Sequence, residues 1–66
     1  MKNNLRVERA IKNITQEELA RNIGVTRQAI NSIELGKYVP STVLALKLSR
    51  YFNKAVNDIF TLEETD

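Results

Sequence analysis

Two short helical segments with almost no chain between them constrain the fold of this sequence more than any other feature. Thr15 and Glu18 form the capping-box pattern, in which each side chain satisfies the other residue's main-chain amide, so a helix begins at Gln16. Gly24 follows two turns later, where a left-handed residue can end that helix. Thr26 caps the next helix almost at once, and the two helices must therefore cross steeply.

The rest of the chain predicts an all-α protein with five short helices in a single domain that spans residues 1–66. The expected helices are 5–12 with Asn4 as its cap, 16–23, 27–35, 42–52 with Ser41 as its cap, and 56–60. In the fourth helix, Ala45, Leu48, Ser49 and Phe52 follow the spacing of an inward stripe. The chain ends, 1–4 and 61–66, can pair as short terminal strands.

Composition removes most catalytic chemistry from consideration. The chain has no cysteine and no histidine, which excludes disulfides, thiolate nucleophiles, nearly all zinc sites and the usual general base. The adjacent acids Glu17-Glu18 and Glu63-Glu64 are better explained as cap residues and a solvated tail. We expect no enzymatic activity, no cofactor and no metal site. Because no long apolar run or signal peptide is present, we expect a cytoplasmic protein that does not cross a membrane.

Charge is distributed unevenly along the chain. The formal net charge is only +2, but Lys2 to Tyr51 carries nine Lys and Arg against four Glu. Lys54 to Asp66 carries one Lys against four acids. A basic surface that is separate from an acidic tail is the pattern expected when one face of the molecule meets phosphates.

The helix that follows Thr26 carries a polar stripe opposite its apolar residues Ile30 and Ile33. The stripe consists of Arg27, Gln28, Asn31, Ser32 and Leu35. Asn and Gln match the N6 and N7 groups of adenine in the major groove, and Arg matches O6 and N7 of guanine. Such a stripe alone is most often a solvated helix face. Its combination with the crossing helices and nearby cations favours DNA reading.

The sequence resembles the phage repressor and Cro type of helix-turn-helix regulator, the Xre family, over about residues 5–60. The resemblance rests on Gln16-Glu17-Glu18-Leu19-Ala20, Gly24-Val25-Thr26-Arg27-Gln28, Ile30, Ile33-Glu34, Gly36-Lys37 and Pro40-Ser41. It implies a compact repressor-like domain that binds double-stranded DNA. Glu8 stands where many relatives carry an apolar residue, which predicts either looser packing of the first helix or a second ion pair.

The resemblance implies a role for each matching residue. Base edges would be contacted by Arg27, Gln28 and Asn31, and the DNA backbone by Gln16, Thr26, Ser32, Lys37 and Tyr38. Arg9 and Glu34 match a structural ion pair of the family. Three backbone assignments keep an alternative: Gln16 as a good first-turn residue, Lys37 as a solvated cation and Tyr38 as a packing lid.

A module this small makes few base contacts, and we expect a homodimer that reads a palindromic operator as a repressor. Leu44, Tyr51, Phe60 and Leu62, within about 44–62, are the candidate dimer residues, with completion of the core as the alternative for these side chains. A second hypothesis is an antitoxin or adaptor that binds a protein partner through its acidic C-terminal tail.

Overall fold

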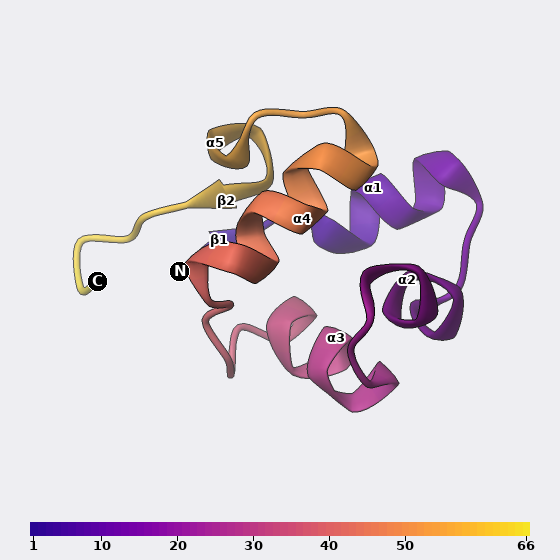
Figure 1. Cartoon of the computed structure of the whole chain (residues 1–66). Coiled ribbons are helices and arrows are strands. Elements are labelled where there is room, and N and C mark those ends of the chain that lie inside the picture. Colours follow the sequence, from indigo (N-terminus) through magenta and orange to yellow (C-terminus); the bar gives the residue numbers. More distant parts are fainter.

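The computed structural model describes all 66 residues, Met1–Asp66, and contains five helices and two short strands (Figure 1). In chain order these are β1 (Lys2–Asn3), α1 (Leu5–Lys12), α2 (Gln16–Ile23), α3 (Arg27–Glu34), α4 (Thr42–Phe52), α5 (Val56–Ile59) and β2 (Phe60–Thr61). The predicted all-α class with terminal strands is confirmed. The fifth helix ends one residue earlier than expected because Phe60 joins β2.

The crossing of α2 and α3 follows from local chemistry at three residues. The Thr15 hydroxyl accepts from the Glu18 amide at 3.0 Å, and the reciprocal contact completes the capping box. Gly24 ends α2 with φ +86°, a left-handed value that an L side chain rarely adopts. The Thr26 hydroxyl then accepts from the Ala29 amide at 3.1 Å and starts α3.

The core is mostly aliphatic, with Phe52 and Phe60 as its aromatic members, and it draws on every helix. Its fully buried side chains are Leu5, Leu19, Ile30, Ile33, Leu48 and Ile59. Ala20, which is 3% exposed, lies in α2 on the side that packs in this core, and its small size allows the close crossing. Figure 1 shows α4 running between the α2–α3 pair and the end of the molecule that holds α5 and the strands. The core therefore fixes the angle between α2 and α3.

Asn4 does not cap α1 with its side chain, contrary to the sequence prediction. It occupies the cap position, but its side-chain amide donates to the Asp58 carbonyl at 3.3 Å. The neighbouring Asn3 supplies the acceptor instead, since its Oδ1 accepts from the Leu5 amide at 3.1 Å. Asn3 also lies in β1, so the sheet and the start of α1 are joined through one residue.

The two ends of the chain meet in the β1–β2 sheet. The strands are antiparallel, with Lys2 opposite Thr61 and Asn3 opposite Phe60. The Met1 ammonium group contacts Glu63 at 2.9 Å and Asp66 at 3.1 Å. These contacts raise the pKa of the N-terminal amine above its usual value of 8.0.

Glu8 is buried, and it forms the second ion pair that the sequence left open. Its carboxylate lies 3.6 Å from the Lys54 ammonium group.

None of the helices is long and apolar enough to span a lipid bilayer.

Candidate nucleic-acid interface

The polar stripe of α3 faces solvent because the opposite face of the helix is held in the core. Ile30 and Ile33 are at most 1% exposed. Arg27, Gln28 and Asn31 are all exposed. The three residues predicted to contact bases therefore lie on the accessible side of one short helix.

One side of this stripe borders a shallow hollow of about 320 Å³. Its lining residues are Thr26, Gln28, Ala29, Ser32, Lys37 and Tyr38. All four of the backbone-contact candidates other than Gln16 are in this set, next to the base-reading candidate Gln28. The structure thus gathers residues from α3 and from the segment after it into one surface.

A tight turn after α3 brings Lys37 and Tyr38 to that hollow. Gly36 has φ +75°, and the Lys37 amide donates to the Ser32 carbonyl at 2.9 Å. The Lys37 side chain is exposed, and no carboxylate lines the hollow beside it. A cation beside hydroxyl groups, with no competing acid, is an arrangement suited to phosphate oxygens.

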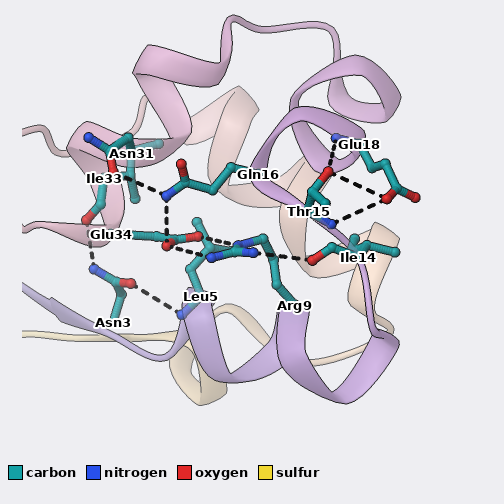
Figure 2. A network of polar contacts seen from close by, with 10 residues as sticks. All are labelled: Asn3, Leu5, Arg9, Ile14, Thr15, Gln16, Glu18, Asn31, Ile33 and Glu34. Carbon is teal, nitrogen blue, oxygen red and sulfur yellow. Dashed lines mark hydrogen bonds and ion pairs between the residues drawn. The ribbon is translucent and has the colours of Figure 1, made fainter.

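On the other side of α3, an ion pair joins Glu34 of α3 to Arg9 of α1 (Figure 2). Arg9 Nε donates to Glu34 Oε2 at 2.5 Å, and Arg9 Nη2 donates to Glu34 Oε1 at 2.9 Å. Glu34 raises the pKa of Arg9 above its usual value through these bonds. Arg9 Nη1 also donates to the Ile14 carbonyl at 3.1 Å, so the pair ties α1, α3 and the turn before α2 together.

Gln16, at the start of α2, joins the same network. Its Nε2 donates to Asn31 Oδ1 and to Glu34 Oε1, each at 3.1 Å. Figure 2 shows the Gln16 amide between these two α3 side chains. Since Nε2 has two hydrogens, both are engaged within the chain. In this arrangement a phosphate contact from Gln16 would come from its main-chain amide.

The sequence does not predict two contributions, that of Arg6, which lies beside the polar stripe, and that of Asn3, which supports the last turn of α3 from β1. Arg6 lines a hollow of about 300 Å³ together with Arg9, Gln16, Asn31, Glu34 and Leu35. It lies one helical turn before Arg9, and this spacing could have placed it on the same face. Asn3 donates to the Ile33 carbonyl at 2.8 Å, but no local sequence pattern links β1 to α3.

The four candidate dimer residues differ in how far their side chains are buried. Leu44 and Phe60 are 7% and 6% exposed and belong to the core, so the alternative of core completion applies to them and they are not candidates for a dimer surface. Tyr51 is half-buried, and its hydroxyl accepts from the Asn22 side-chain amide at 3.2 Å. Leu62 is 77% exposed. An interface in this region would therefore use Leu62 with other exposed side chains.

Comparison with known proteins agrees with this geometry. A helix-turn-helix family model matches residues 5–59. An uncharacterised HTH-type transcriptional regulator of Methanocaldococcus jannaschii is 48% identical over 66 residues, all of both chains. Another, from Bacillus subtilis, is 47% identical over 64 residues, 97% of each chain. The solution structure of the SOS-response transcriptional repressor LexA from Eubacterium rectale aligns with a TM-score of 0.81 and 30% identity, over 96% of this chain and 67% of that one.

The fold and the exposed stripe on α3 are those of a DNA-binding helix-turn-helix domain. The chain belongs to the Xre-type helix-turn-helix family of transcriptional regulators. This is a family of proteins that bind double-stranded DNA, and it is not an enzyme family.

Proposed function

We propose that this regulator acts as a homodimeric repressor that reads a palindromic operator, with two kinds of DNA contact. Arg27, Gln28 and Asn31 contact base edges and determine sequence preference. Thr26, Ser32, Lys37 and Tyr38 contact the backbone, together with the main-chain amide of Gln16. The hollow that collects the backbone set beside Gln28 is the observation that supports this division most directly.

An apolar patch that involves α4, α5 and the segments after α3 and β2 supports dimerisation. We define the apolar patch as Val39, Leu46, Val56 and Leu62. Val39 and Leu46 are each 58% exposed and line one hollow with Val56, and Leu62 lines a second hollow that also includes Val56. Exposed apolar surface of this kind is stabilised by contact with another protein surface. Two-fold helix-turn-helix dimers read half-sites about one helical turn, roughly 34 Å, apart, and we expect the same spacing for a dimer formed through this patch.

Selection of bound duplexes from a random pool, repeated at two salt concentrations, tests the DNA-binding part of the proposal. The expected result is a palindromic motif with two half-sites. Lys37→Ala should weaken binding to all sequences alike and reduce the salt slope by about 0.9, the value for one lost phosphate contact. A loss that depends on the sequence of the site would contradict the backbone role of Lys37.

The dimer surface is tested by placing a charge in the apolar patch. Leu46→Arg should give a monomer by light scattering and lose affinity for the full palindrome. Ile11→Arg is the matched control, because Ile11 is also exposed, at 68%, but lies on α1 outside the patch. A Leu46→Arg variant that remains dimeric would remove the patch from the proposal.

Repression is tested with the selected operator placed across a promoter. Occupancy of the operator blocks polymerase, so transcription in vitro should fall as the protein is added. Two acids of the C-terminal tail, Glu63 and Asp66, pair with the Met1 ammonium group, and Glu64 is the tail acid that makes no ion pair. A rise in transcription would contradict repression, and co-purification of a stoichiometric partner would favour the antitoxin or adaptor hypothesis.

A further inference from the structure

We propose that the side-chain amide nitrogen of Asn31 donates to an acceptor atom on a base edge and prefers guanine to adenine. The orientation of the Asn31 amide is fixed by a series of hydrogen bonds from Arg9 through Glu34 and Gln16, which we call the relay. This inference rests on the proposed function, in which Asn31 contacts a base edge. It assigns Gln16 a positioning role that acts through Asn31. The relay consists of four of the residues that Figure 2 draws as sticks, Arg9, Glu34, Gln16 and Asn31.

The orientation of an amide side chain is decided by its neighbours. The oxygen and nitrogen of Asn or Gln differ little in shape, so a free amide can present either group to a partner. The relay begins with a group that has no such freedom. Arg9 has only donors, and its Nε and Nη2 both point at Glu34. Glu34 is thereby fixed as an acceptor, with its side chain only 6% exposed.

Glu34 in turn determines the orientation of Gln16. Glu34 Oε1 lies 3.1 Å from the Gln16 amide, and a carboxylate that already accepts from a guanidinium group needs a donor at this position. Gln16 must therefore turn Nε2 toward Glu34. The reversed amide would place two oxygens, Gln16 Oε1 and Glu34 Oε1, against each other.

Gln16 in turn determines which group of the Asn31 side-chain amide faces α2. The second hydrogen of Nε2 is directed at Asn31, and only the Asn31 oxygen can accept it, at 3.1 Å. Asn31 Oδ1 is thus held toward α2, and Nδ2 is left as the group available to DNA. Gln28 differs, because no hydrogen bond within the chain fixes its amide.

A fixed donor has a different base preference from a free amide. A bidentate contact to adenine requires the amide oxygen to accept from N6 while the amide nitrogen donates to N7. Guanine presents two acceptors, O6 and N7, which suit the Nδ2 donor alone. Asn31 is therefore expected to prefer guanine, whereas Gln28 remains able to form the bidentate contact to adenine.

Selection of bound duplexes with the full-length protein and its Gln16→Ala and Asn31→Ala variants tests the relay. In the unmodified protein, one position per half-site should be guanine and should become degenerate in Asn31→Ala. Gln16→Ala frees the Asn31 amide, so adenine should be accepted there and the guanine-to-adenine ratio should fall roughly tenfold. Glu34→Gln is a second variant that lets the Gln16 amide rotate, and it should shift the ratio in the same direction.

Glu17→Gln is the matched control, because Glu17 is an exposed acid of α2 outside the relay. It should leave the guanine-to-adenine ratio unchanged. Replacing the guanine by 7-deazaguanine, which lacks the N7 acceptor, should weaken binding of the unmodified protein and have no effect on Asn31→Ala. A structural role of Gln16 alone would change affinity without changing the base preferred at this one position.

Two failures can be told apart. If no motif is enriched, the proposed function fails and the relay fails with it. If a motif is enriched but the Asn31-dependent position is adenine, or Gln16→Ala leaves its guanine-to-adenine ratio unchanged, the relay is overturned and the proposed function stands. A motif with no position that depends on Asn31 also overturns the relay.

Discussion

The first and last turns of α3 differ in how their side chains are held. Arg27 and Gln28, in the first turn, are exposed and make no side-chain hydrogen bond within the chain. Asn31 and Glu34, in the last turn, are bonded to Gln16, and Glu34 is also bonded to Arg9. One eight-residue helix therefore carries two adaptable side chains and two whose positions are set by other helices.

The cause of this difference is the placement of α1 and the start of α2. Asn31 and Glu34 are three residues apart and share a face, so both meet Gln16 on the same side of α3. The first turn of α3 lies beyond the reach of that network. The comparison predicts that substitutions in the last turn change stability as well as DNA selectivity, whereas substitutions in the first turn change DNA selectivity alone.

Glu34→Ala is expected to give the largest loss of stability. It removes the carboxylate partner of Arg9, whose side chain is only 14% exposed, and leaves a largely buried cation unpaired. Loss of one partner of such a pair costs about 3 kcal/mol in the free energy of unfolding, measured by urea denaturation. Glu17→Ala removes an exposed acid and should change stability by less than about 0.5 kcal/mol. Equal effects of the two variants would mean that the pair is not a support of α3.

Gln28→Ala is the corresponding test of the first turn. Its amide has no partner in the chain, so the unfolding free energy should not change. Selectivity at one base pair should fall by about 1–3 kcal/mol, measured by competition between matched and mismatched operators. A loss of stability without a loss of selectivity would reverse the assignment of this turn.

A smaller effect is expected for Asn3→Ala, which removes a support of the last turn from β1. Asn3 donates to the Ile33 carbonyl and accepts from the Leu5 amide. Removing both bonds should cost about 1 kcal/mol in urea denaturation, because each also exchanges with water in the unfolded chain. Asn4→Ala is the control, since the exposed Asn4 side chain makes a single bond, at 3.3 Å. Comparable losses would restore Asn4 as the important cap residue.

The parts of this structure that sequence could predict are those encoded by local pattern. Thr15, Gly24 and Thr26 act through neighbours within a few residues, and their caps and turn appear as expected. The Asn3 contact with α3 joins residues 30 positions apart, and no short-range rule specifies it. The sequence left Leu44 between two assignments for a related reason, because an apolar residue beside a helical stripe suits either the core or an interface. Only the packing of the whole chain decides between them.

The smallest predicted effect concerns the ends of the chain, where the Met1 ammonium group holds Glu63 and Asp66 beside β1. The N-terminal pKa is raised above 8.0, so this stabilisation is present below pH 8 and is lost as pH rises through the folded value. The pKa of Asp66 is lowered from 3.8 by its bonds to the Glu63 amide and the N-terminus, so the stabilisation from Asp66 is present above pH 4 and is lost at more acidic pH.

Acetylation of the N-terminus should abolish the alkaline loss of stability, measured as the difference in urea midpoint between acetylated and free protein from pH 7 to 9. NMR titration should move the signals of Glu63 and Asp66 over that range and leave Gln28 unmoved. An acetylated protein with the same alkaline loss would show that the contact between the termini does not support β1.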